Sequence, residues 1–236
     1  MLSDLLIQRA AAMGIGMTKA QAEQFEAYHA LLTDANARMN LTRVAEDASE
    51  AADRNYLDCI AVLAGDFPRV ETAVDVGSGA GFPGIPLAIM LPRVRFTLID
   101  ALGKRVDFLR RVIDRLGLNA EALHLRAEDA ARQPALRETF DLATARAVAP
   151  MNVLCEYLLP LIRPGGWALA LKGPGLDEEL IQAGGALRLL GGEARRVQPL
   201  AIPGRDWAHR AAWIAKARPT PEKYPRRSGA PEKRPL

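Results

Sequence analysis

The stretch that decides the fold is Asp75-Val-Gly-Ser-Gly-Ala-Gly-Phe-Pro-Gly84, a glycine-rich turn. A short apolar run at 72–76 precedes it and predicts a strand, and residues 83–91 follow it and predict a helix. Glycine allows positive φ angles and a close approach of the backbone to a ligand. A carboxylate or phosphate can lie at the N-terminus of the following helix. We therefore interpret the turn as the floor of a ligand site.

Strands and helices alternate downstream of this turn. Further strands are predicted at 95–100, 122–126, 140–145, 167–171, 193–200 and 211–216, and helices at 104–116, 150–161 and 176–190, with a turn at 164–166. This alternation predicts right-handed crossovers and a parallel sheet with helices on both faces. Upstream, helices are predicted at 18–38, with Thr18 as N-cap, and at 48–63. We expect an α/β, seven-stranded Rossmann-like core at 67–218, an N-terminal helical extension at 1–66 packed on it, and a tail at 219–236.

The composition indicates one globular chain. The 236 residues carry 31 basic and 28 acidic side chains, and the net charge is +3. No apolar run is long enough to predict a membrane span, and the first residues lack the pattern of a signal peptide. Cys59 and Cys155 have no metal-ligand spacing, so we expect two reduced thiols, no metal site and a cytoplasmic protein.

Basic residues concentrate near the C-terminus. Residues 216–236 contain seven basic and two acidic side chains. Such a segment suits contact with phosphates or remains a solvated tail, and composition leaves both readings open. A second basic group starts the helix at 104–116 and comprises Lys104, Arg105, Arg110 and Arg111. With the tail, this group would form a phosphate-binding rim, and its alternative is a solvated helix face.

The ligand of the glycine turn is predicted from the acids beside it. Gly79-Ala-Gly81-Phe-Pro-Gly84 fits the dinucleotide pattern, so NAD has to be considered. Asp75, two residues before Gly77, suits the amino group of a methionine moiety better than a pyrophosphate. Too few residues follow the fifth strand for a dehydrogenase substrate domain. Asp100, at the end of the next strand, can accept both ribose hydroxyls of an adenosine. We predict S-adenosylmethionine; the alternative is a turn without a ligand.

Two later strand ends add candidate residues. Ala127 and Glu128 follow the third strand and would flank the adenine; Glu128 could equally be a surface carboxylate. Arg146 follows the fourth strand, where no Pro-Pro pair typical of enzymes acting on base amines is present. Neither cysteine is placed to attack a pyrimidine. What remains is an acceptor that is already nucleophilic, such as guanine N7. Arg146 would bind guanine O6 or the cofactor carboxylate, or support the strand end.

Several motifs together resemble one family. They are Asn40-Leu-Thr42, the turn continued to Ile85-Pro86, Leu98-Ile-Asp-Ala-Leu-Gly-Lys-Arg105, Thr144-Ala-Arg146, Leu171-Lys-Gly173 and the tail Lys223-Tyr-Pro-Arg-Arg-Ser-Gly-Ala-Pro231. This set is similar to the bacterial 16S ribosomal RNA guanine-N7 methyltransferases, also called glucose-inhibited division protein B. The chain departs from that family at Asn55-Tyr-Leu-Asp58-Cys59, where His and Ser usually surround the Asp. A substrate role for this helix is therefore in doubt, although Asp58 remains.

The resemblance implies a class I methyltransferase fold, S-adenosylmethionine as donor and one guanine of 16S ribosomal RNA as target. It implies cofactor contacts at Gly77, Phe82, Ala127, Glu128 and Arg146, to which the reasoning above adds Asp75, Gly79, Gly81 and Asp100. Arg146 and Lys172 are the expected catalytic residues. We expect a monomeric enzyme that acts on the RNA or the small ribosomal subunit, without metal or membrane. The alternatives are a small-molecule methyltransferase and an inactive RNA-binding relative.

Overall fold

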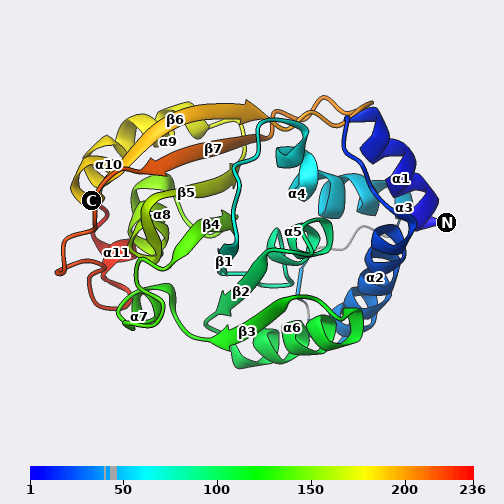
Figure 1. Ribbon diagram of the computed structural model, residues 1–236, viewed down its shortest axis with the longest axis horizontal. Coiled ribbons are helices and arrows are strands. Elements are labelled where there is room, and N and C mark those ends of the chain that lie inside the picture. The colour runs from blue at the N-terminus through cyan, green and yellow to red at the C-terminus, as the bar shows by residue number, and fades with distance from the viewer. Residues whose placement is uncertain (40, 43–46) are drawn as a thin grey trace.

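A computed structural model describes residues 1–39, 41, 42 and 47–236. Its centre is a seven-stranded sheet in the order β3-β2-β1-β4-β5-β7-β6 (Figure 1). The strands are β1 (Thr72–Val76), β2 (Arg95–Asp100), β3 (Ala120–His124), β4 (Phe140–Arg146), β5 (Ile162–Lys172), β6 (Gly192–Pro199) and β7 (Arg210–Lys216). The predicted seven-stranded α/β sheet is confirmed. Asn40, from one of the family motifs, lies outside the described residues.

The sheet is not entirely parallel, which corrects the prediction. Strands β1 to β5 run parallel, but β7 is antiparallel to both β5 and β6. Only residues 200–209 join β6 to β7, and they contain no helix. A parallel connection needs a crossover of a dozen or more residues, so this link forms a hairpin instead.

The helices are α1 (Leu2–Ala12), α2 (Lys19–Met39), α3 (Ala48–Ala51), α4 (Asp58–Ile60), α5 (Gly84–Met90), α6 (Gly103–Leu116), α7 (Ala127–Ala130), α8 (Met151–Leu158), α9 (Leu176–Gln182), α10 (Gly184–Leu190) and α11 (Ala230–Lys233). Helix α1 was not predicted. Thr18 accepts from the Gln21 N–H at 3.3 Å and caps α2 as predicted. Gly117, at φ 63°, caps the C-terminal end of α6. Within the described residues, no helix combines the length and apolarity needed to cross a bilayer.

Three predicted segments differ in detail. The helix expected at 48–63 consists of α3, a π-helical stretch at Ala52–Leu57, α4 and a 3-10 turn at Ala61–Ala64. The helix expected at 176–190 breaks at Ala183 before two glycines, which are poor helix formers. The turn expected at 164–166 lies within β5, and β3 ends at His124 because the chain then enters α7.

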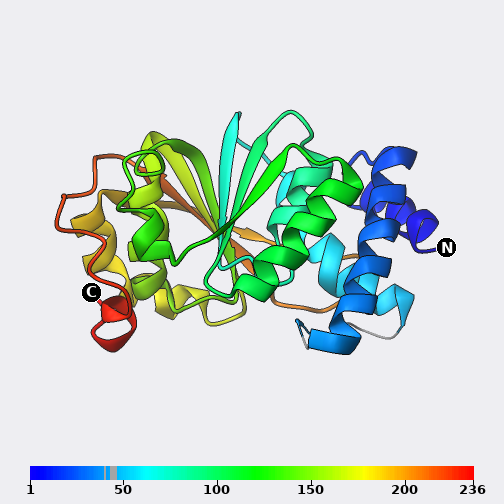
Figure 2. The same cartoon turned by 90° about the horizontal axis from the view of Figure 1, so that it is seen from below.

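Alternate strand residues build two cores on opposite faces of the sheet. In β1, Ala73 belongs to the core shared with the N-terminal helices, α5 and α6. Its neighbour Val74 belongs to the core shared with α7, α8 and α10. Figure 2 shows these helices in layers on either side of the sheet. The N-terminal helices thus share one core with the sheet; the proposed boundaries at 66 and 218 remain predictions.

The C-terminal segment, residues 217–236, packs on α7 and α8 at the end of the molecule opposite the N-terminal helices (Figure 1). Arg137 donates to the carbonyls of Tyr224 and Thr220, and Arg132 donates to that of Pro225. The segment is therefore not a solvated tail. Lys216, counted among the basic residues of 216–236, is buried and bonded to four oxygens of the protein, so it cannot contact phosphate.

Candidate functional site

The glycine turn folds tightly against the end of β2. Gly77, Gly79 and Gly81 have φ angles of 68°, 58° and 106°, which disfavour other residues. The N–H groups of Gly77 and Ser78 donate to the carbonyl of Ile99 at 2.8 and 3.1 Å. A Cβ at Gly77 would lie 2.8 Å from Val148 Cγ2, so the backbone reaches Val148 only because this residue is glycine.

Asp75 lies underneath the turn. Its Oδ1 accepts from the Thr144 hydroxyl at 2.9 Å, and its Oδ2 accepts from the Gly84 N–H at 3.2 Å. Burial raises the pKa of this carboxyl to about 6, although hydrogen bonds from neighbours oppose the shift. The side chain fixes the start of α5 and is not among the residues lining either pocket described below. The predicted contact of Asp75 with a methionine amino group stays a prediction.

A cavity of about 120 Å³, the strand-end pocket, opens above the turn. Its lining comprises Val76, Gly77, Ile99, Asp100, Ala101, Leu125, Arg126, Ala127, Glu128, Val148, Tyr157 and Glu232. Of the predicted cofactor residues, the structure brings Gly77, Asp100, Ala127 and Glu128 together here. Asp100 accepts from the N–H groups of Gly79 at 2.8 Å and Leu102 at 2.9 Å. Each carboxylate oxygen can accept a further hydrogen bond, so Asp100 remains able to bind hydroxyls.

The C-terminal segment supplies one wall of the strand-end pocket, which the sequence did not predict. The Gly229 N–H donates to Glu128 Oε1 at 2.8 Å. The Tyr157 hydroxyl donates to Glu232 Oε1 at 3.1 Å. These contacts join residues 75 and 101 positions apart in the chain, and no local pattern announces them.

A second cavity of about 370 Å³, the helix-side pocket, lies between the N-terminal helices and the ends of β4 and β5. Its lining comprises Thr42, Arg54, Asn55, Asp58, Arg146, Ala147, Leu171, Lys172, Gly173, Leu200 and His209. Ala147 borders this pocket, and the next residue, Val148, borders the strand-end pocket. Ala147 has a φ of 56°, a strained value for a residue with a Cβ. Consecutive residues of one turn thus separate the two cavities.

Charged and polar side chains converge in the helix-side pocket. Arg146 Nη1 donates to Asp58 Oδ2 and to the carbonyl of Arg54, both at 3.2 Å. His209 Nδ1 lies 2.8 Å from the other Asp58 oxygen. The buried Asn55 Nδ2 has no hydrogen-bond partner among the described residues. A buried donor without a partner costs free energy unless a ligand or water satisfies it.

The sequence missed half of this cluster. Arg146 was predicted and Asp58 was noted, but Asn55 and His209 were not singled out. His209 lies 151 positions from Asp58, so spacing gives no signal. The π-helical stretch at 52–57 adds a residue to its turns, and no apolar periodicity predicts it.

Two other predicted residues, Phe82 and Lys172, bind neighbouring groups of the protein. The guanidinium of Arg146 stacks on the ring of Phe82, with 4.6 Å from Cζ to the ring centroid. Phe82 is buried against Tyr28 and Tyr56 and does not line the strand-end pocket. Lys172 Nζ donates to Glu179 Oε2 at 2.6 Å and to the carbonyl of Ala149 at 2.7 Å. Phe82 therefore supports Arg146, whereas Lys172 lines the helix-side pocket and its catalytic role stays a prediction.

Both cysteines are buried and free. Burial raises the pKa of each thiol to about 12, so the thiols are protonated at neutral pH. The nucleophile in thiol chemistry is the thiolate. Neither cysteine is suited to attack a substrate.

The basic start of α6 lies beside the strand-end pocket. Lys104 and Arg111 are exposed, and Arg105 Nη1 is 3.6 Å from Asp100 Oδ2. Arg110 donates to the carbonyl of Ala122. Lys104 and Arg111 are thus accessible to phosphate, whereas Arg105 and Arg110 also contact groups of the protein itself. The phosphate-binding rim stays a prediction.

Comparisons with known proteins agree with this arrangement. The family model GidB, rRNA small subunit methyltransferase G, matches residues 21–206. A ribosomal RNA small subunit methyltransferase G of Clostridium perfringens is 41% identical over 235 residues, covering 99% of this chain and 98% of the relative. One of Thermoanaerobacter sp. (strain X514) is 42% identical with the same coverage.

Solved structures support the fold alone. A TehB-like SAM-dependent methyltransferase of Corynebacterium glutamicum has a TM-score of 0.52 at 16% identity, covering 79% of this chain and 98% of that one. A branched-chain polyamine synthase of Thermus thermophilus has a TM-score of 0.58 at 14% identity, covering 86% and 64%. With the family model and the near-complete relatives, the resemblance seen in the sequence is confirmed: this chain belongs to the GidB family, rRNA small subunit methyltransferase G.

Proposed function

We propose that this member of the rRNA methyltransferase family transfers a methyl group from S-adenosylmethionine to N7 of one guanine in 16S ribosomal RNA. The strand-end pocket would hold the donor and the helix-side pocket the guanine. The observation that carries this proposal is that Ala147 and Val148, one peptide apart, border the two different cavities. A base in one cavity and a donor in the other would meet across this turn.

The residues of the strand-end pocket fit an S-adenosyl group. Asp100 offers carboxylate oxygens to ribose hydroxyls at the end of a strand, where such ligands bind in open α/β sheets. Ile99 and Leu125 offer apolar surface to an adenine. Gly77 has no side chain to obstruct the approach to the backbone. Asp75 contributes indirectly by holding the turn in place.

The helix-side pocket offers what guanine requires. Guanine has an acceptor, O6, beside two donors, N1–H and the N2 amino group. Asn55 Nδ2 and the guanidinium of Arg146 offer donors for O6, and the Asp58 carboxylate offers acceptors for N1–H and N2–H. A guanine bound through O6, N1 and N2 keeps N7 free, because N7 lies on the side of O6 that faces away from N1.

The chemistry needs no general base. S-adenosylmethionine supplies an electrophilic methyl group bound to a sulfonium sulfur. The lone pair of guanine N7 forms the new N–C bond as the C–S bond breaks, and no proton leaves the base. The tasks of the protein are then orientation and electrostatics. Asp58, held by Arg146 and His209, would place a negative charge near the base as the ring becomes cationic.

We propose that the enzyme acts as a monomer. The predicted partner is 16S ribosomal RNA or the small subunit, and an enzyme acting on it works in the cytoplasm.

A labelling assay tests the proposal. Purified protein, tritiated S-adenosylmethionine and 16S RNA from a strain lacking the enzyme should yield label in N7-methylguanine at one position. Label in another base or only in small metabolites would refute it, and no label would favour an inactive RNA-binding protein.

Two variants separate the pockets. Asp100→Ala should weaken binding of S-adenosylhomocysteine by about 1.5–3 kcal/mol, the value of a hydrogen bond to a charged group. Asp58→Asn should lower kcat/KM for RNA and leave that affinity unchanged. Asp177→Asn, which also removes a carboxylate paired with an arginine but at the surface, is the control. The assignment of the two pockets fails if Asp58→Asn weakens only the binding of S-adenosylhomocysteine.

A further inference from the structure

We propose that residues 226–234, the C-terminal clasp, bind phosphates of the substrate RNA, and that this binding strengthens the hold of the strand-end pocket on the methyl donor. The inference rests on the proposed function and adds a second contact site and a link between the two substrates. It starts from a cavity of about 550 Å³ that neither pocket of the active site includes.

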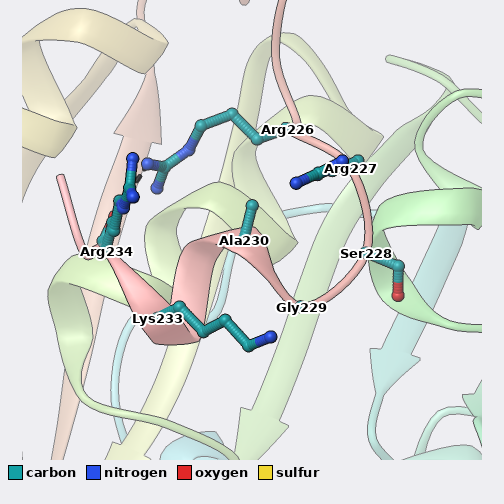
Figure 3. Close-up of a pocket in the computed structure, with 7 residues that line it drawn as sticks. All are labelled: Arg226, Arg227, Ser228, Gly229, Ala230, Lys233 and Arg234. Atoms are coloured by element: carbon teal, nitrogen blue, oxygen red, sulfur yellow. Dashed lines mark hydrogen bonds between the residues drawn. The ribbon is translucent and has the colours of Figure 1, made fainter.

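Cationic side chains dominate this cavity. Its lining comprises Arg226, Arg227, Ser228, Gly229, Ala230, Lys233 and Arg234 (Figure 3). Arg227, Lys233 and Arg234 are exposed and take part in no ion pair within the part of the chain that the structure describes. Figure 3 shows the loop leading from Arg226 around Gly229 into α11. The cations that line the cavity therefore come from the stretch before Gly229 and from the end of α11. Such a cluster lacks its own counter-charge and favours an anion.

The fourth cation, Arg226, is bonded to other groups of the protein and holds the clasp in shape. Its Nη2 donates to Glu156 Oε2 at 2.6 Å, and its backbone N–H donates to Glu156 Oε1 at 2.6 Å. Glu156 is fully buried, so the carboxylate of this pair is shielded from solvent. Arg226 Nη1 also donates to the carbonyl of Arg234 at 2.7 Å and links the start of the clasp to its end. These hydrogen bonds of Arg226 thus define the closed form of the clasp.

The other side of the clasp belongs to the strand-end pocket. Gly229 donates to Glu128, and Glu232 accepts from Tyr157, and three of these four residues line that pocket. Any opening of the clasp would break these hydrogen bonds and remove one wall. An anion that holds the clasp closed therefore favours the donor-bound form. Linkage requires the converse as well, that the donor strengthens binding of the anion by the same factor.

A polyanion fits the clasp better than a single phosphate does. The three free cations lie on residues up to seven positions apart around an open loop, and the backbone of RNA presents phosphates in series. Phosphate contacts fix the position of a nucleic acid without reading its sequence. The clasp would therefore anchor the RNA while the helix-side pocket selects the base.

The test compares two triple variants of the full chain. Arg227→Gln with Lys233→Gln and Arg234→Gln removes the free cations of the clasp. Arg69→Gln with Arg93→Gln and Arg95→Gln removes the same charge from exposed residues near the start of β1 and β2, at the opposite edge of the sheet. For each protein, binding of 16S RNA is measured over a range of salt concentrations. Binding of S-adenosylhomocysteine is measured with and without RNA.

The clasp variant should bind RNA at least tenfold more weakly, with a salt dependence shallower by about 2–3 in the slope of log K against log salt. Its kcat at saturating RNA should fall little. RNA should tighten S-adenosylhomocysteine binding to the wild type and the control variant, but not to the clasp variant. Equal losses in the two variants, or no tightening by RNA in the wild type, would overturn the proposal. Tightening by inorganic phosphate alone would assign the cavity to a small anion instead.

These outcomes are distinguishable from failure of the proposed function. If the wild type labels N7 of guanine in 16S RNA and the two variants behave alike, only the clasp proposal fails. If the wild type labels no guanine, the proposed function fails first.

Discussion

The two segments that flank the sheet are attached by different forces. The N-terminal helices bury Phe25, Tyr28 and Leu32 completely and share a core with the sheet. The C-terminal segment buries few apolar side chains and is held by hydrogen bonds from Arg132, Arg137 and the Glu156 pair. One segment is part of the core, and the other is strapped across its surface.

The difference has an energetic meaning. Burying a large apolar side chain contributes about 1.5–3 kcal/mol, whereas a typical hydrogen bond contributes about 1 kcal/mol net. The N-terminal helices should therefore unfold with the whole protein. The C-terminal segment should open locally at lower cost. This suits their proposed roles, since the first supports a rigid base pocket and the second a wall that responds to RNA.

The largest effect is expected in the N-terminal helices. Phe25→Ala removes a fully buried ring that packs edge-on against Tyr56, with centroids 5.5 Å apart. The free energy of unfolding in urea should fall by about 3–5 kcal/mol. Ile181→Ala, at a side chain that is 80% exposed, is the control and should change stability by less than about 0.5 kcal/mol. A similar small change for Phe25→Ala would mean that the N-terminal helices do not share the core.

The next effect concerns Asp75, under the glycine turn between the two segments. Burial raises its pKa from 3.8 to about 6, so the folded protein binds a proton that the unfolded chain has already released. The stability that this proton confers is complete below pH 3.8 and is lost as the pH rises to about 6. The stability of the wild type minus that of Asp75→Asn should therefore fall by roughly 2 kcal/mol between pH 4 and pH 6.5. A constant difference, measured by urea unfolding across this range, would contradict the raised pKa.

The smallest effect on global stability is expected in the C-terminal segment. Glu156→Gln removes the charge that holds Arg226, which can turn to solvent because its side chain is 26% exposed. The cost should be about 1–3 kcal/mol, below the loss typical of a fully buried pair. Trypsin should cleave after Arg226 and Arg227 sooner than in the wild type, while cleavage elsewhere is unchanged. Glu178→Gln, at an exposed carboxylate on α9, should leave the digestion pattern as it is.

The sequence predicted the parts of the fold that depend on local patterns, such as the bounds of individual strands. Strands β1 and β2 begin and end where the sequence placed them, because an apolar run meets a glycine turn or an acid there. The predicted direction of β7 was wrong because the direction of a strand depends on the connection that precedes it and not on the residues of the strand. The strand-end pocket was half predicted, since Gly77 and Asp100 belong to a recurring motif. Glu232, which completes it, comes from the C-terminal segment, and the family motif at 223–231 does not indicate where that segment packs.

Even less of the helix-side pocket could be predicted from the sequence. Arg146 was predicted from its place after β4, but its partners depend on tertiary packing. Asp58 becomes available through a π-helical stretch, and His209 arrives from the last hairpin. Sequence periodicity carries no information about either event.

The reversed direction of β7 has a consequence for how this enzyme can vary. Because β7 is antiparallel, its first residue, Arg210, pairs with Lys172 at the end of β5, and His209 is delivered to the edge of the sheet that holds both pockets. A slip of one residue in this pairing would turn His209 away from Asp58. The pairing between β5 and β7 therefore has to stay fixed during evolution for His209 to remain beside Asp58.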